Sequence, residues 1–393
     1  MTSLQQTVDA QVAAGRVPGA VALVADGDDV TVVTAGVRAV GGTPMTRDTL
    51  FRIASITKPI VAAAVMVLVD RGRIGLDDPV GPWLPELAEP VVLRRPDGAL
   101  DDVVPAVRPI TVRHLLTFQA GHGFPADLDL PVVARLMGDL SQGPPQPQAV
   151  LPPDEWMARL SRIPLLHQPG EGWTYNTGSD ILGVLLARVE GAPLGDVLDE
   201  AVLGPLGMAD TGFAVPDGGL DRMAGHHRRT AGGFEVIDPP DGQWATTPAF
   251  PAGAGGLVST VDDWCAFGRM LLAGGDHRGK RILSADAVRQ MMTSHVEAEP
   301  DSPFLEGHGW GFGGSVDLAP TEPWNVPGRY GWVGGTGTAA YVIPSRRRLV
   351  IWMSQVELEG PDDARAMAAV LTWAAQRPDV GGYATTSARR PRT

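Results

Sequence analysis

Apolar positions at strand spacing gather near both ends of the chain. Residues 17–37 hold two runs rich in β-branched side chains, joined by the turn-forming cluster DGDD at 26–29, and this combination predicts a hairpin. Two further strand-like runs, GTAAYVIP at 337–344 and RLVIWMSQ at 348–355, flank a polar turn. We therefore predict one antiparallel sheet assembled from both chain ends.

Apolar positions at helical spacing occupy most of the remaining chain. Helices are expected beside the strands at 3–14 and 364–376. Between them, the periodicity predicts helices at 111–118, 154–163, 179–191 and 260–275, separated by loops rich in proline and glycine. The pattern predicts an α+β fold in which helices pack against the sheet and a mostly helical insertion forms a cleft with it.

This pattern also divides the chain into regions. Residues 1–75 and 326–379 should form an α/β region, 76–325 a mostly helical region, and 380–393 a disordered tail. Within the helical region, 138–156 has five prolines between 144 and 153 and few apolar anchors. We expect a surface loop or flap there.

Composition excludes several classes of function. The formal charge is −13, from 32 basic and 45 acidic residues, so the phosphate backbone of a nucleic acid would be repelled on average. Cys265 is the single cysteine, which excludes an intrachain disulfide and a cysteine-rich metal site.

The chain offers no membrane-spanning or secretory pattern. Its longest apolar run, Ile60 to Val69, has 10 residues, about half of the roughly 20 that a membrane-spanning helix needs. The first 20 residues lack the basic and apolar regions of a secretory signal. We expect a cytoplasmic protein without a membrane partner.

Candidate chemistry lies at the start of that apolar run. In SITK at 55–58, a helix beginning at or just after Ser55 would place the serine and Lys58 on one face. A partly desolvated lysine can manage the proton of a neighbouring hydroxyl, and the helix N-terminus can stabilise an oxyanion. By itself the motif also fits a capping serine followed by a solvated lysine.

The wider sequence decides between these two interpretations. The segments FRIASITKPIVAAAVMVLVD, PGEGWTYNTGSDILGVLLARVEG, GAGGLVSTVDDWCAFGRMLLAGG and YGWVGGTGTAAYVIP together resemble the serine β-lactamase and penicillin-binding-protein-like superfamily. Within it they are most similar to class C β-lactamase-like hydrolases and family VIII carboxylesterases. The resemblance extends from about residue 5 to residue 375, in the expected order.

The resemblance implies roles for individual residues. It makes Ser55 the acylated nucleophile and Lys58 its proton-managing partner. Tyr175, in YNTGSD, is the expected general base, because a nearby ammonium would stabilise its phenolate; otherwise it is a core tyrosine with a satisfied hydroxyl. The family's Tyr-x-Asn is altered, since Thr177 stands at the asparagine position and Asn176 just before it. Either side chain is expected to help bind substrate.

A third family motif, Lys-Thr-Gly, is replaced here by Trp332, Val333 and Gly334. The family's lysine and threonine hold a substrate carboxylate, which neither tryptophan nor valine can do. We expect these three residues to bind substrate, with Gly334 allowing a close approach. The backbone N–H groups of Ser55 and Gly335 would form the oxyanion hole.

The resemblance implies a serine hydrolase that cleaves small-molecule carboxylic esters, preferring short acyl chains, without a metal or cofactor. The departure from Lys-Thr-Gly shifts the expectation from lactam to ester. Alternatives are a β-lactamase or D-amino-peptidase, which would cleave an amide, and an acyltransferase that uses the same acyl-enzyme. A non-enzymatic alternative is an idle ligand-binding or sensor homologue. The oligomeric state is not predicted.

Overall fold

The computed structural model describes residues 2–297, 304–305, 307–359 and 364–378. The expected tail at 380–393 lies outside these residues. The α-helices are α1 (Leu4–Ala13), α2 (Lys58–Asp70), α3 (Val112–Leu116), α4 (Pro131–Leu140), α5 (Pro153–Leu160), α6 (Thr177–Glu190), α7 (Leu194–Leu198), α8 (Gly204–Leu206), α9 (Val261–Leu272), α10 (Ala285–Met291) and α11 (Arg365–Ala375).

The strands form one large sheet and several small ones. They are β1 (Gly19–Asp26), β2 (Asp29–Gly36), β3 (Phe51–Arg52), β4 (Val91–Leu93), β5 (Val103–Pro105), β6 (His226–Thr230), β7 (Gly233–Asp238), β8 (Val258–Ser259), β9 (Asp276–His277), β10 (Lys280–Arg281), β11 (Gly309–Trp310), β12 (Ser315–Val316), β13 (Tyr330–Gly334), β14 (Thr338–Ile343) and β15 (Arg348–Ser354).

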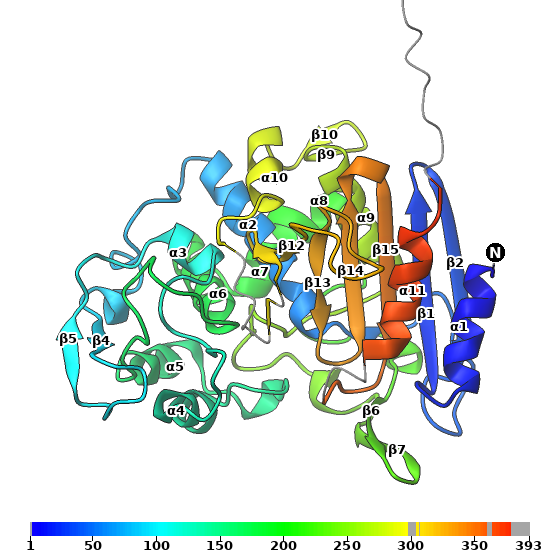
Figure 1. Ribbon diagram of the computed structural model, residues 1–393, viewed down its shortest axis with the longest axis horizontal. Helices are drawn as coiled ribbons and strands as arrows, with labels where there is room; N and C mark the ends of the chain where they lie inside the picture. Colours follow the sequence, from blue (N-terminus) through cyan, green and yellow to red (C-terminus); the bar gives the residue numbers. More distant parts are fainter. Residues whose placement is uncertain (1, 298–303, 306, 360–363, 379–393) are drawn as a thin grey trace, which may run out of the picture.

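The large sheet joins both ends of the described chain. Its seven strands run β11-β12-β13-β14-β15-β1-β2, and every neighbouring pair is antiparallel (Figure 1). The pairing of β1 with β15 confirms the predicted sheet. The hairpin between β1 and β2 turns at Gly27, whose φ of 60° suits glycine. β11 and β12 also join the sheet, although the sequence pattern places them in the mostly helical region.

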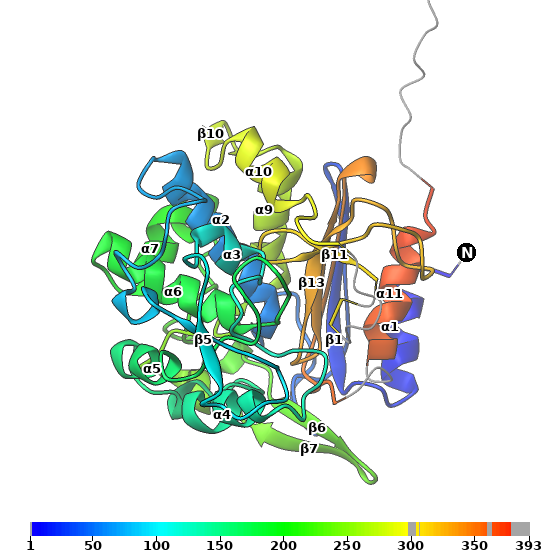
Figure 2. The same ribbon diagram turned by 60° about the vertical axis from the view of Figure 1, so that its left-hand side comes forward.

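Helices cover both faces of this sheet. α1 and α11 lie side by side on one face, and the helical part of the chain lies against the other (Figures 1 and 2). Alternate residues of β15 point to opposite faces of the sheet. Val350 and Trp352 pack with α1 and α11, while Leu349 and Ile351 join the larger core. Burial on both faces explains why these strands read as continuous apolar runs.

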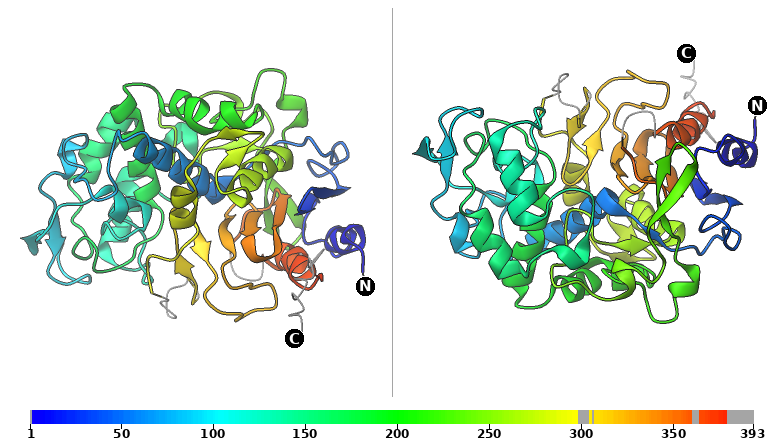
Figure 3. Two further views of the ribbon diagram at one scale, coloured as in Figure 1. Left: turned by 90° about the horizontal axis from the view of Figure 1, so that it is seen from above. Right: turned by 90° about the horizontal axis from the view of Figure 1, so that it is seen from below.

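Helix α2 forms the centre of the helical part. Every residue from Lys58 to Leu68 is buried, as expected for a helix that is apolar all round. It packs against α6, α7 and α10. Seen from above and below, α2 extends from the helical region toward the sheet (Figure 3). Its first residue therefore lies where the two parts of the fold meet.

Between α4 and α5 the segment 138–156 is mostly exposed loop, as the sequence pattern predicts, but a few buried residues anchor it to the rest of the fold. It holds the end of α4, a short 3₁₀ turn at Pro147–Ala149 and the start of α5. Leu140, Gln142 and Trp156 are buried within it. Pro147 begins the 3₁₀ turn and Pro153 begins α5, a position that tolerates a missing N–H.

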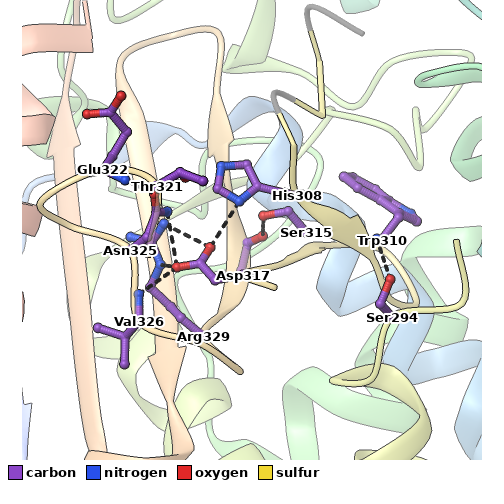
Figure 4. Close-up of polar contacts among 11 residues, drawn as sticks. Ser294, His308, Trp310, Ser315, Asp317, Thr321, Glu322, Asn325, Val326 and Arg329 are labelled. Atoms are coloured by element: carbon purple, nitrogen blue, oxygen red, sulfur yellow. Dashed lines mark hydrogen bonds and ion pairs between the residues drawn. The ribbon is translucent and has the colours of Figure 1, made fainter. Parts of the chain in front are cut away.

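A buried polar cluster holds the connection between β12 and β13 (Figure 4). The Asp317 carboxylate accepts hydrogen bonds from Arg329 Nε (2.8 Å) and Nη2 (3.2 Å), Asn325 Nδ2 (3.1 Å) and the Val326 N–H (2.8 Å). His308 Nδ1 lies 3.3 Å from the same carboxylate. A buried charge satisfied on this many sides fixes the path of the chain into β13.

The turn between β13 and β14 is fastened to the segment before Ser55. Thr336 Oγ1 donates to the carbonyl of Arg52 (2.5 Å), and Thr338 Oγ1 donates to that of Ile53 (2.9 Å). Gly334 lies between these contacts: a Cβ there would be 2.5 Å from the Ile53 oxygen. The close approach of the two segments therefore requires glycine at this position.

Gly334→Ala is expected to destabilise the protein by about 1–3 kcal/mol, because the added methyl overpacks this contact. Gly335→Ala is the matched control, since a Cβ at Gly335 meets no atom within 4 Å. Denaturant unfolding of both variants measures the effect. Equal loss of stability in the two variants would contradict the assigned role of Gly334.

Candidate active site

Ser55 and Lys58 adjoin where a 3₁₀ turn enters α2. Ser55 lies in that turn, Ala54–Thr57, and Lys58 is the first residue of α2. Lys58 Nζ donates to Ser55 Oγ at 2.8 Å. The preceding residue, Ala54, has a φ of 44°, a left-handed conformation that costs a non-glycine residue roughly 1–2 kcal/mol. Such strain is common where a reactive side chain must be presented.

Lys58 is fully buried, which excludes the alternative of a solvated lysine in the first helical turn. Its Nζ also donates to the Ala254 carbonyl at 2.6 Å and lies 4.7 Å from the centre of the Tyr175 ring. Burial lowers the pKa of Lys58 to about 7, and the nearby charge of Asp180 opposes that change. Near neutral pH a substantial fraction of the amine is therefore unprotonated.

The hydroxyl of Tyr175 also reaches Ser55. It hydrogen-bonds the Ser55 side chain and accepts from Trp332 Nε1 at 2.6 Å. Burial raises the pKa of Tyr175 to about 12, outweighing these two hydrogen bonds, which lower it. The direction is opposite to the one expected from a phenolate stabilised by Lys58. Tyr175 is therefore a phenol at neutral pH.

Aromatic rings enclose Tyr175. Phe304 stacks on it with ring centres 4.6 Å apart, and Phe118 meets it edge-on at 5.9 Å. Trp332 is tilted against it at 5.7 Å and contacts Trp310 in turn. This packing restricts the position of the phenol and shields part of its ring from water.

Two polar residues that the sequence argument missed, Asp180 and Gln142, adjoin this group. Asp180, in the first turn of α6, is buried and accepts from the Ala254 N–H at 2.9 Å and from Gln142 Nε2 at 2.8 Å. Burial raises the pKa of Asp180, and Lys58 and its hydrogen-bond donors oppose that change. Asp180 could have been found from the sequence, because its carboxylate follows Tyr175 closely in the chain. Nothing in the proline-rich segment around Gln142 marks that residue.

Ser55 opens into a mostly apolar chamber of about 380 Å³. Tyr175, Asn176 and Gly335 line it together with Ser55. Among the described lining residues there is no lysine or arginine. Apolar side chains from the 124–156 region and from Phe250 form much of the wall: Phe124, Leu128, Val133, Met137, Leu140, Val150, Trp156 and Phe250. The chamber size is typical of a small-molecule site.

The other residues expected to bind substrate make contacts elsewhere. Trp332 donates to Tyr175, and Gly334 contacts the segment before Ser55. Val333 is partly buried on β13. Thr177 is fully buried, and its hydroxyl donates to Gln142 Oε1 at 2.6 Å. Within the described residues these four are absent from the chamber lining; a direct contact with substrate stays a prediction.

Two ionisable side chains complete the chamber wall. His226 and Glu357 both line it. Burial, with Arg52 nearby, lowers the pKa of His226 to about 3, so this imidazole is neutral at ordinary pH. Glu357 is paired with Arg228 at 3.0 Å. Neither residue supplies a positive charge to the chamber.

No helix among the described residues has the length and apolar character needed to cross a bilayer. This finding agrees with the short apolar runs of the sequence.

Comparisons with known proteins place this chain among relatives of known family. The beta-lactamase family model matches residues 4–372. An uncharacterized protein of Mycobacterium tuberculosis is 40% identical over 329 residues, covering 80% of this chain and 79% of that protein. Esterase EstB of Burkholderia gladioli is 36% identical over 320 residues, covering 76% of this chain and 74% of its own.

Among solved structures, this chain resembles EstCE1, described as a hydrolase with promiscuous acyltransferase activity. The TM-score is 0.78 at 26% identity, covering 94% of this chain and 97% of that one. Together with the family model, which spans nearly the whole sequence, this likeness shows that the chain belongs to the beta-lactamase family.

Proposed function

We propose that the protein hydrolyses carboxylic esters through an acyl-enzyme on Ser55. The observation that carries the proposal is the 2.8 Å contact between Ser55 Oγ and the amine of a fully buried lysine. With its pKa lowered to about 7, Lys58 can accept a proton from the serine at neutral pH. In this mechanism Lys58 is the general base, and Tyr175, which is a phenol at neutral pH, is a proton donor.

The proposed cycle has two steps. In the first, Ser55 Oγ attacks the ester carbonyl, its proton passes to Lys58, and the N–H groups of Ser55 and Gly335 stabilise the oxyanion. The alcohol leaves as Tyr175 donates the phenolic proton to its oxygen, and Lys58 restores that proton. In the second step, water attacks the acyl-enzyme while the same groups accept and return its proton.

Charge favours an ester over a β-lactam or a D-amino-peptide as substrate. Those substrates carry a carboxylate that a lysine would hold, and Trp332 stands at the corresponding position. The described chamber lining includes Asp180 and Glu357 but no lysine or arginine, so an anionic substrate would gain no charge-assisted bond there. The names of EstB and EstCE1 support the same choice. We further propose that the protein prefers esters with short acyl chains.

Acyl transfer to an alcohol is the second candidate function. It would use the same acyl-enzyme and differ in the acceptor. The apolar lining of the chamber favours it, because such a surface can bind an organic acceptor in place of water, and EstCE1 is described as having promiscuous acyltransferase activity. Product analysis with added alcohols separates the two functions.

Replacing the nucleophile tests the reaction. Ser55→Ala is expected to lower kcat for p-nitrophenyl acetate at least about 1000-fold, as loss of a serine nucleophile does in other hydrolases. Wild type should cleave the acetate and butyrate faster than the octanoate and leave nitrocefin nearly intact. Ser141→Ala, at another serine of the chamber wall, is the control that keeps activity. Ester cleavage that survives in Ser55→Ala would overturn the mechanism, and rapid nitrocefin turnover the substrate class.

The pH profile tests the identity of the base. Because Lys58 must be unprotonated to accept the serine proton, kcat/KM should rise with pH through about 7 and fall about tenfold per unit below it. Tyr175 and Asp180 are the ionisable groups that face Lys58. Steady-state rates between pH 5 and 9 measure the profile. Full activity at pH 5 would exclude Lys58 as the base.

Replacing Trp332 tests whether this residue supports the Tyr175 hydroxyl or contacts the substrate. Trp332→Phe removes the indole N–H but keeps an aromatic ring, and it should lower kcat by roughly 3- to 10-fold, the value of one neutral hydrogen bond. KM should change little. Trp324→Phe, at a partly buried tryptophan that packs against the core under α1 and α11, is the control. A rise in KM at constant kcat would instead show that Trp332 contacts substrate.

A further inference from the structure

Gln142 connects the chamber wall to helix α6 through both ends of its amide. It lies just beyond α4, is 7% exposed and lines the chamber. Its Oε1 accepts from Thr177 Oγ1 at 2.6 Å, and its Nε2 donates to Asp180 Oδ2 at 2.8 Å. A carboxylate cannot donate to the amide oxygen, so the two partners together fix the orientation of the amide.

Asp180 and Lys58 both hydrogen-bond the backbone of Ala254, one at its N–H group and the other at its carbonyl. The N–H of Ala254 donates to Asp180 Oδ1 at 2.9 Å, and the carbonyl of Ala254 accepts from Lys58 Nζ at 2.6 Å. Both ionisable side chains are buried. The negative charge of Asp180 favours the protonated form of Lys58, and the ammonium favours the ionised form of Asp180. Proton binding at the two groups is therefore linked.

We propose that Gln142 is a positioning residue: by donating to the Asp180 carboxylate, it sets how strongly the protein holds a proton on Lys58. The inference rests on the proposed function, because the proton in question is the one that Lys58 takes from Ser55. It also assigns a chemical role to the segment 138–156. Among the residues of that segment, Gln142 brings a hydrogen-bond donor to the buried pair.

The proposal differs from a purely structural role in what it predicts for proton binding. A glutamine that only fastened its segment to α6 would, when replaced, lower stability without moving the titration of Lys58. Removing a donor to the Asp180 carboxylate makes its ionised form less favourable. Lys58 then loses part of its counter-charge and releases its proton at lower pH. Tyr175 is the other ionisable group beside Lys58, and His226 and Glu357 lie farther along the chamber wall.

The test measures the reaction of Ser55 with a p-nitrophenyl alkylphosphonate as a function of pH. Ser55 Oγ forms a bond to phosphorus, p-nitrophenolate leaves, and the serine proton passes to Lys58. The inactivation rate of wild type should rise with a midpoint near the pKa of Lys58, about 7. In Gln142→Met, which keeps the length of the side chain but removes its hydrogen bonds, the midpoint should fall by about 0.5 pH unit or more.

Two further variants complete the experiment. Gln146→Met changes another glutamine of the same segment and chamber wall, and its midpoint should match wild type. Thr177→Val removes the hydroxyl that orients the Gln142 amide and should give a smaller shift in the same direction; it carries the test if Gln142→Met does not fold. A folded Gln142→Met with the wild-type midpoint would overturn the inference. Wild type that is not labelled at Ser55 would instead overturn the proposed function.

Discussion

The site depends on the burial of one amine. Lys58 is the first residue of a helix that is apolar from Pro59 to Val69, so the packing that stabilises α2 also removes the Nζ atom from water. An uncompensated ammonium would be costly there. The fold compensates with the Ala254 carbonyl, the Tyr175 ring and the charge of Asp180. Tyr175 and Asp180 come from the start of α6 and the residues just before it, whereas Ala254 comes from a distant loop, and each contributes to the arrangement around Ser55.

The same burial supports the proposed division of acid and base roles between Lys58 and Tyr175. Desolvation disfavours whichever form is charged, so it lowers the pKa of the amine and raises that of the phenol. A phenolate beside an ammonium would reverse the roles, but the hydrogen bonds from Ser55 and Trp332 do not outweigh burial. The environment, rather than the ordinary order of the two pKa values, makes the lysine the stronger candidate for the base.

The sequence predicted the sheet, the main helices and the contact of Ser55 with Lys58, because these follow from local periodicity and short spacing. It did not predict which residues anchor the loop in segment 138–156, since a high proline content gives no information about burial. Gln142 and the Trp332–Tyr175 bond were also missed, because they join residues far apart in the chain. The direction of the Tyr175 pKa depends on surroundings that only the folded chain creates.

The position of β13 also has a consequence for how the protein is made. Ser55 is near the beginning of the chain, whereas Gly335 and the threonines that fasten the turn after β13 to the segment before Ser55 are near its end. β1 likewise lacks its β15 neighbour until the last strand has left the ribosome. The nascent chain can therefore carry its serine and lysine through most of synthesis before Gly335 joins them, so under the proposed mechanism the oxyanion hole is completed only when the final strands are added.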